Sequence, residues 1–169
     1  MKRIISAFFL LVAPVVFANA ADFSGSWSLD MKQSTNLPPY YANIKSHKLS
    51  IAQDKEHLTV AVAIDAGRAA ADKFNFIYNL DGSDSMTETP IRTPDGLLNV
   101  PTVLNLKTGA DGKLTINITR DIKLGDKSFK GITSEEWELG KDRKTLRIKR
   151  SDTFPDGRTA TAEMIFVKV

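Results

Sequence analysis

The sequence lacks cysteine entirely and has only two histidines among its 169 residues. Without thiols the chain can form no disulfide, perform no thiolate chemistry and carry no lipid on a cysteine at a processed N-terminus. The histidines, His47 and His57, belong to one predicted hairpin, in which His47 faces inward and His57 lies outside or in the turn. Because this spacing does not suit a pair of metal ligands, we expect neither a metal nor a cofactor.

Catalytic motifs are missing as well. The sequence contains no nucleophile elbow, no glycine loop that could cradle a phosphate and no dinucleotide fingerprint. An enzyme normally needs a nucleophile beside a base, a metal cluster or a matched pair of carboxylates. We therefore predict no catalytic residues and a protein that is not an enzyme.

Long hydrophobic runs are confined to the first 20 residues. Lys2 and Arg3 precede an apolar run over residues 4–17, and the tripeptide ANA that follows is a small-x-small cleavage site. The apolar run is shorter than the roughly 20 residues that a spanning helix needs. The pattern predicts a signal peptide over residues 1–20, cleaved after Ala20.

The remaining residues, 21–169, have the length of one domain, and a chain of this size can bury a substantial core. No later segment is apolar enough to span a bilayer, so we expect a soluble mature protein. Small secreted eukaryotic domains tend to be rich in disulfides. A cysteine-free exported chain therefore favours the bacterial periplasm, with secretion into the medium as the other option.

Neither sign of charge is in large excess. Lys and Arg number 23 against 20 acidic residues, and removal of the two basic residues near the start leaves 21 against 20, or a net charge of about +1. The basic run KDRKTLRIKR at 141–150 fits a solvated hairpin tip, in which Glu136 and Glu138 face Lys149 and Arg147. The charge distribution gives no reason to expect nucleic acid or an anionic membrane as a partner.

From Asp22 onward, apolar residues recur mainly at every second position, which is the period of a half-buried β-strand. The turn sequences LDGSD, TPDG, GADGK, KLGDK, GKDRK and FPDGR separate the alternating segments. Alternation occurs over residues 23–29, 47–51, 58–64, 74–80, 100–106, 114–118, 133–139, 146–148 and 162–166. The pattern predicts an all-β, antiparallel up-and-down meander of about eight to ten strands.

A meander of this length exposes its edges unless it closes on itself, so the predicted fold is a small barrel, with a two-sheet β-sandwich as the alternative. No segment after the first 20 residues has a helical stripe of useful length. Residues 31–43, MKQSTNLPPYYAN, are irregular because Pro38 and Pro39 forbid a regular strand or helix interior. We expect this segment to form a lid or plug at one end of the barrel.

Two predicted hairpins near the C-terminus agree on which face points inward. FPDGR suits a three-residue loop with Gly157 in the left-handed conformation, which pairs Phe154 with Arg158. A turn centred on Asp142 and Arg143 fixes the preceding hairpin independently, and a one-residue slip in either would reverse the inward face. The expected pairs are Arg150–Ala162, Ile148–Met164, Leu146–Phe166, Leu139–Leu146, Trp137–Ile148 and Glu135–Arg150.

The segment FSGSW on the first predicted strand resembles the start of calycin-type barrels, the group that contains lipocalins and fatty-acid-binding proteins. The resemblance implies that Gly25 and Trp27 are structural, with Trp27 packed at the closed end of the barrel. The later segments YNLDGSDS, GKLTINITR, SEEWELGKDRKTLRIKR and PDGRTA…FVKV are similar to a family of exported bacterial lipocalin-like proteins of unknown function. There is no C-terminal helix as in lipocalins, and too little chain between the first two strands for a fatty-acid-binding helical pair, so no further ligand residues carry over.

Three charged residues fall in the inward, apolar phase of the predicted strands. Arg120 follows Leu114, Ile116 and Ile118 on their face, Arg150 follows Leu146 and Ile148, and Glu135 precedes Trp137. A charge inside a barrel is costly unless it is paired, and an arginine paired with a carboxylate is the usual solution. Either these residues form a structural pair or reach water at the rim, or an arginine anchors a ligand's acidic group, as in fatty-acid-type barrels.

We therefore expect a barrel that binds a small, partly apolar ligand, with an acidic ligand as one option. The alternative is a filled barrel that serves as a structural or protein-interaction module of the cell envelope. The oligomeric state is not predicted. The candidate ligand-binding residues are Arg120, Arg150, Glu135, Tyr78, Phe76 and Trp137.

Overall fold

A computed structural model describes residues 21–67, 71–93, 96–154 and 156–169. The predicted signal peptide lies outside the described residues and stays a prediction. Within the described ranges the chain forms ten β-strands and one short 3-10 helix, η1, and has no α-helix. None of the described helical residues belongs to a helix long and apolar enough to cross a membrane.

The strands follow one another through short connections, except between β1 and β2, where η1 (Pro39–Asn43) interrupts a longer one. Their bounds are β1 (Gly25–Leu29), β2 (Ser46–Gln53), β3 (His57–Asp65), β4 (Asp72–Asn79), β5 (Ser85–Thr93), β6 (Gly96–Thr108), β7 (Leu114–Leu124), β8 (Lys127–Leu139), β9 (Thr145–Thr153) and β10 (Thr159–Lys168).

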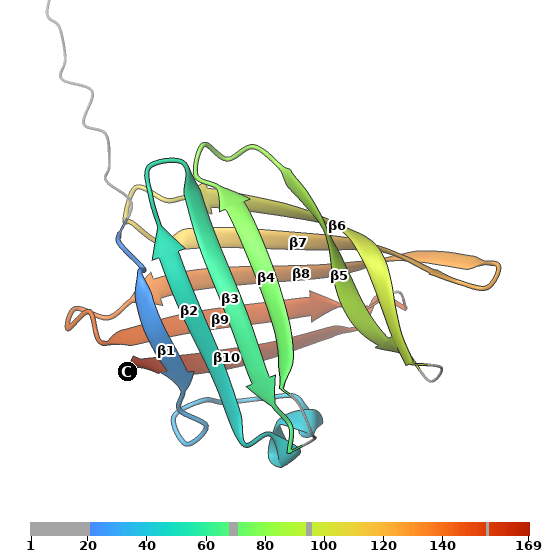
Figure 1. The fold of residues 1–169 in the computed structure, drawn as a ribbon, viewed down its shortest axis with the longest axis horizontal. Helices are drawn as coiled ribbons and strands as arrows, with labels where there is room; N and C mark the ends of the chain where they lie inside the picture. The colour runs from blue at the N-terminus through green and yellow to red at the C-terminus, as the bar shows by residue number, and fades with distance from the viewer. Residues whose placement is uncertain (1–20, 68–70, 94–95, 155) are drawn as a thin grey trace, which may run out of the picture.

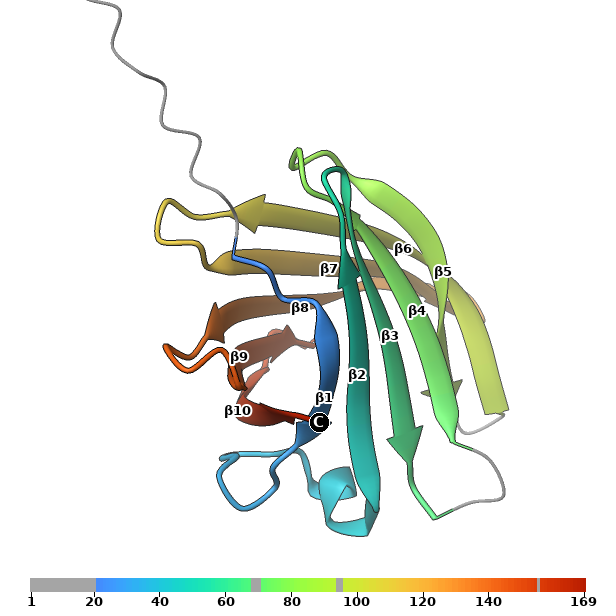
Figure 2. The same cartoon turned by 60° about the vertical axis from the view of Figure 1, so that its left-hand side comes forward.

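All ten strands belong to one antiparallel sheet in the order β4-β3-β2-β1-β10-β9-β8-β7-β6-β5. The first and last strands pair with each other, so the sheet curls into a barrel that is complete except between β4 and β5, its two edges. Figures 1 and 2 show β1 to β4 wrapping across β7 to β10 to enclose the interior. The predicted up-and-down barrel is confirmed, and the sandwich alternative is wrong because the described strands form a single sheet.

The predicted hairpin registers are confirmed. Arg150 lies opposite Ala162 in the β9–β10 pair and opposite Glu135 in the β8–β9 pair. At the β9–β10 turn the Phe154 N–H donates to the Arg158 carbonyl at 2.9 Å, and Gly157 has a φ of +81°. That conformation is one that glycine adopts without the steric cost of a side chain. The inward face of β9 is therefore fixed by both neighbours.

One strand, β5, was not expected. Its sequence, SMTETPIRT, has no alternation of apolar and polar residues, and it contains Pro90. A proline cannot donate to a strand ladder and is tolerated mainly at sheet edges. Because β5 is one of the two edge strands, the position of Pro90 agrees with that rule. Because this strand lacks alternation, its residues could not be recognised as a strand from a period of two.

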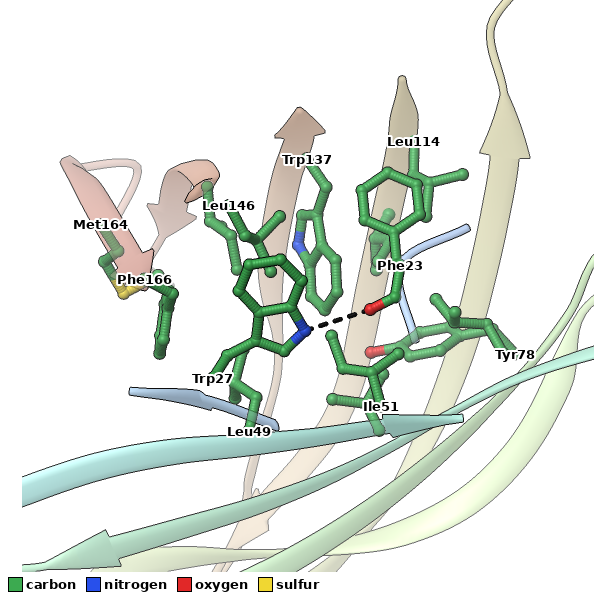
Figure 3. Packing of buried hydrophobic residues seen from close by; sticks show 14 of the residues in the cluster. Phe23, Trp27, Leu49, Ile51, Tyr78, Leu114, Trp137, Leu146, Met164 and Phe166 are labelled. Carbon is green, nitrogen blue, oxygen red and sulfur yellow. Dashed lines mark hydrogen bonds between the residues drawn. The ribbon is translucent and has the colours of Figure 1, made fainter. Parts of the chain in front are cut away.

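Side chains fill one half of the barrel, which we call the closed half. Members that are nearly inaccessible to solvent include Phe23, Trp27, Leu58, Leu106, Leu114, Leu146 and Phe166. Trp27 is 1% exposed, and its Nε1–H donates to the Phe23 carbonyl at 3.1 Å (Figure 3). The expected burial of Trp27, on the first strand, is confirmed.

Gly25, on the same strand, allows a close approach of the Lys168 side chain. Its φ is +142°, and a Cβ built there would lie 2.5 Å from Cε of Lys168. The Lys168 side chain crosses this position and places its Nζ 5.2 Å from the centre of the Trp27 ring. Gly25 thus leaves room for a cation–π contact on the indole, which fits its expected structural role.

The opposite half, which we call the open half, has inward-facing apolar residues that remain only half-buried. They are Val62, Ile64, Phe74 and Phe76, while Ile122 and Phe129 continue the inward phase on the part of the β7–β8 hairpin that pairs with neither β6 nor β9. The segment that contains η1 lies at this end, where Tyr41 and Ile44 are buried against the core cluster. The expected lid or plug at 31–43 therefore covers part of this end, and the inward face beside it keeps contact with solvent.

Candidate functional site

Glu135 and Arg150 form the centre of the polar residues that face inward. They lie opposite each other on β8 and β9, and Arg150 Nη1 donates to Glu135 Oε1 at 3.2 Å. The Glu135 side chain is almost fully buried, whereas that of Arg150 is 31% exposed. A charge in such surroundings is costly unless it is paired, and the register pairs these two.

Asp152 binds the same guanidinium, and sequence analysis missed it. Arg150 Nε donates to Asp152 Oδ2 at 2.7 Å, and Nη2 donates to Oδ1 at 2.8 Å, which makes a two-point contact. Burial would raise the pKa of Asp152, but the hydrogen bond from Arg150 and its charge outweigh burial and lower that pKa. Asp152 continues the inward phase of Leu146, Ile148 and Arg150, and this spacing could have identified it.

Thr133 joins Arg120 to this group. The Thr133 hydroxyl donates to Asp152 Oδ1 at 2.7 Å and accepts from Arg120 Nη1 at 3.1 Å. Arg120 Nε also donates to the Thr89 hydroxyl at 3.3 Å, and Thr89 and Thr102 share a hydrogen bond of 2.7 Å. The seven residues Thr89, Thr102, Arg120, Thr133, Glu135, Arg150 and Asp152 therefore form one connected set, which we call the inner network.

Arg120 differs from Arg150 in its partners. Among the described residues, no carboxylate forms a direct ion pair with Arg120. Burial and the charge of Arg150 lower the pKa of Arg120, while the charges of Asp152 and Glu135 act in the opposite direction. For Arg150, burial also lowers the pKa, but Glu135 and Asp152 raise it to a net value above the ordinary one. Both arginines therefore stay charged at neutral pH.

Three aromatic candidates lie beside the inner network. Trp137 Nε1 donates to Glu135 Oε2 at 2.8 Å. Tyr78 is buried, and burial followed by the charge of Glu135 raises the pKa of its phenol, so it stays protonated. Figure 3 shows the Tyr78 hydroxyl directed toward the packed interior, and the half-buried Phe76 stacks on the Tyr78 ring with centroids 6.3 Å apart.

A second polar pair, Tyr41 and His47, connects η1 to the barrel wall. The Tyr41 hydroxyl lies 3.0 Å from His47 Nδ1 and 3.8 Å from the sulfur of Met164. His47 is 8% exposed, and its Nε2 has no hydrogen-bond partner among the residues that the structure describes. Burial, together with the charge of Arg150, lowers the pKa of His47 to about 4, so the ring is neutral at pH 7. The predicted inward position of His47 is confirmed.

A hollow of about 440 Å³, whose lining includes Glu135 and Arg150, lies against β7 to β10 and the chain before η1. Most of its lining side chains alternate with the buried ones and therefore belong to the outer face of the barrel. They are polar or charged, and Lys149 is paired with Glu136 at 3.7 Å. The lining residues are Thr35, Asn36, Thr115, Ser134, Glu135, Glu136, Lys149, Arg150, Ser151, Thr161, Ala162 and Glu163.

The structure brings most of the predicted site residues together. Arg120, Glu135, Arg150 and Trp137 are joined by hydrogen bonds through the inner network, with Tyr78 and Phe76 beside it. Their role in ligand binding stays a prediction. Within the described ranges, no group of three or more histidine and acidic side chains is placed to hold a metal ion.

The described strands form a nearly closed antiparallel barrel of ten strands with a polar set on its inner face. Neither a family model nor a curated protein matches the chain. Among solved structures, the crystal structure of zebrafish ileal bile acid-binding protein complexed with cholic acid is similar, with a TM-score of 0.51 and 14% identity. The match covers 87% of this chain and 98% of that one. At this level of identity the comparison supports the calycin-type fold alone.

Proposed function

We propose that the barrel binds a small, partly apolar molecule on its inner face, with the apolar part in the open half and a polar end at the inner network. The observation that carries the proposal is the contrast between inward-facing positions. Leu58, Leu106 and Leu114 are fully buried, whereas Val62, Phe74 and Phe76 keep exposed surface although they face inward. Apolar surface that faces a concave interior and touches water gains free energy when an apolar molecule covers it.

The bile acid-binding neighbour supports the same proposal, because its barrel is similar to this one and its crystal structure is a complex with cholic acid. Such a molecule combines an apolar body with polar groups. In this chain the half-buried apolar residues and the inner network provide matching surfaces for both parts of a ligand.

We also propose that the protein works outside the cytoplasm, as an exported bacterial lipocalin-like protein. The charged start, the apolar run and the ANA site at residues 1–20 support this proposal. N-terminal sequencing of protein recovered from the periplasm or medium should give a first residue of Ala21. Recovery only from the cytoplasm, with Met1 or its processed form at the N-terminus, would contradict export.

Ligand binding can be tested with adjacent substitutions on opposite faces of β4. Phe76 faces inward, whereas Ile77 faces outward and is 47% exposed. The uncharged fluorescent probe N-phenyl-1-naphthylamine should bind the wild-type protein, bind Phe76→Ser at least about tenfold more weakly, and bind Ile77→Ser unchanged. Native mass spectrometry of the exported protein should also detect a co-purified small molecule. An absence of probe binding, or equal weakening by both substitutions, would contradict the proposal.

The alternative is a barrel that carries no ligand and serves as a structural or protein-interaction module. The observation that favours it is that Arg150 already has partners within the protein. Glu135 and Asp152 accept three hydrogen bonds from its guanidinium. This alternative predicts no bound small molecule and no probe binding, so the experiment on β4 separates the two functions.

A further inference from the structure

We infer that the inner network selects ligands whose polar end is uncharged, such as an alcohol, ester or amide, over ligands that end in a carboxylate. The inference rests on the proposed function, because it concerns the polar end of a molecule held in the open half. It is carried by the charge balance and the hydrogen bonds of the inner network, which treat the two arginines differently.

The inner network is electrically balanced as it stands. It contains two guanidinium groups, Arg120 and Arg150, and two carboxylates, Glu135 and Asp152, so its formal charges cancel. The neighbouring Tyr78 and His47 are neutral at pH 7. A ligand carboxylate would add a net negative charge to a partly buried site, and burial of an unbalanced charge is costly. An uncharged polar end adds no such cost.

Arg150 is poorly placed to receive an anion. Its Nε, Nη1 and Nη2 all donate to Glu135 or Asp152, at distances between 2.7 and 3.2 Å. A ligand carboxylate at this guanidinium would either displace one of these carboxylates or lie beside two negative charges. Both outcomes weaken binding, because like charges at such short range repel strongly in a partly buried site.

Arg120 can donate further hydrogen bonds, and the carboxylates of the inner network already balance its positive charge. Among the described residues, only its Nε and Nη1 find hydrogen-bond acceptors, and both acceptors are threonine hydroxyls, which leaves further N–H groups for a ligand oxygen. Thr133 connects it directly to Asp152, whose negative charge already favours the protonated Arg120. Gly131, the residue opposite Arg120 on β8, contributes no side chain of its own, and Ile122 Cδ1 lies 3.2 Å from the position that a Cβ would take there. Arg120 can therefore donate to a carbonyl or hydroxyl oxygen of an uncharged ligand.

The test is a competition between ligands that share one chain and differ at the polar end. At pH 8, 1-dodecanol, methyl dodecanoate and dodecanoate compete with N-phenyl-1-naphthylamine for the wild-type protein. We expect the alcohol and the ester to displace the probe at concentrations at least about tenfold lower than dodecanoate. In Asp152→Asn, which leaves the inner network with a net positive charge, the preference should shrink at least about fivefold or reverse.

Asp156→Asn is the matched control. It removes the same charge from an exposed turn carboxylate that is paired with Arg158, outside the inner network. It should keep the wild-type preference, which separates a local effect from the total charge of the protein. Glu135→Gln removes the other carboxylate and keeps the test usable if Asp152→Asn fails to fold, as judged by thermal unfolding.

The outcomes separate the two proposals. If the probe binds but dodecanoate competes as well as the alcohol, or if the network variants keep the wild-type preference, the charge inference is wrong and the proposed function stands. If the probe binds and none of the three ligands displaces it, the charge inference is also wrong and the proposed function stands. If the probe does not bind the wild-type protein, the proposed function fails, and the inference fails with it.

Discussion

The strands alternate in the same way in both halves of the barrel interior, but the two halves differ in how fully side chains fill them. In the closed half, inward-facing residues such as Trp27, Leu58 and Leu114 are packed until almost no surface is accessible. In the open half, the inward-facing Phe74 and Phe76 remain half-buried. Alternation therefore fixes which face a residue points to, and it does not fix whether that face is filled. We expect stability to depend mainly on the closed half and binding mainly on the open half.

The largest expected effect is the loss of the closed-half tryptophan. Trp27→Ala should lower the free energy of unfolding by about 3–5 kcal/mol, because it removes a large buried side chain and leaves a cavity. Phe76→Ala in the open half should cost clearly less, since Phe76 is only half-buried. Urea unfolding of both variants measures the difference. If Trp27→Ala were as stable as Phe76→Ala, the distinction between the two halves would be contradicted.

The next effect concerns the inner network, which lies between the halves. Arg150→Met leaves Glu135 and Asp152 without their cation and should cost about 3 kcal/mol, toward the low end for a buried pair because Arg150 is 31% exposed. Glu135→Gln in the Arg150→Met background should recover part of that loss. Thermal and urea unfolding of the single and double variants checks both steps. A cost under about 1 kcal/mol would place these residues on the rim.

Acidification provides a test that needs no ligand. His47 has a pKa of about 4 in the folded protein, against 6.5 ordinarily, so the unfolded chain takes up its proton at a higher pH than the folded one. Stability should therefore fall as the pH decreases from about 6.5 toward 4, by up to about 3 kcal/mol over that range. Urea unfolding between pH 7 and pH 5 samples the upper part of the fall. In His47→Phe the dependence in that interval should flatten, and an unchanged dependence would refute the assignment to His47.

The smallest expected effect is on the outer face of the same two strands. Glu136 and Lys149 are direct neighbours of Glu135 and Arg150, but their side chains point to solvent and are 3.7 Å apart. A double-mutant cycle with alanine at both positions should give a coupling of about 0–1 kcal/mol. The inner pair should give a clearly larger coupling in the same assay. Equal couplings would mean that the inner face is as well solvated as the outer one.

Much of the fold could be predicted because turns and alternation specify it locally. The Gly157 turn and the neighbouring hairpin placed Glu135 opposite Arg150, as the structure has them. The edge strand β5 was not predicted, because a strand at the edge of a sheet requires no apolar alternation and tolerates a proline such as Pro90. The outward partner of Arg147 was also only partly predictable, since this residue pairs with Glu163 on β10 at 3.3 Å rather than with Glu138.

The sequence could predict which residues of the candidate site face inward, but it could not predict which of them contact one another. Arg120, Glu135 and Arg150 could be assigned inward from their phase, yet the links through Thr133 and Thr89 depend on how β5 to β9 curve around the interior. Tyr41 comes from the irregular segment before β2, where no periodic pattern exists, so its contact with His47 had no signal in the sequence. Contacts between distant segments require the closed barrel.

The most direct test of the account is a methyl NMR titration of the full mature chain with N-phenyl-1-naphthylamine. We predict that the methyl signals of the open-half residues Val62 and Ile64 shift with saturable dependence on the probe. The signals of the closed-half residues Leu58 and Leu114 should stay in place. Shifts confined to the closed half or the outer face, or no saturable shift at all, would contradict the claim that the open half is the binding surface.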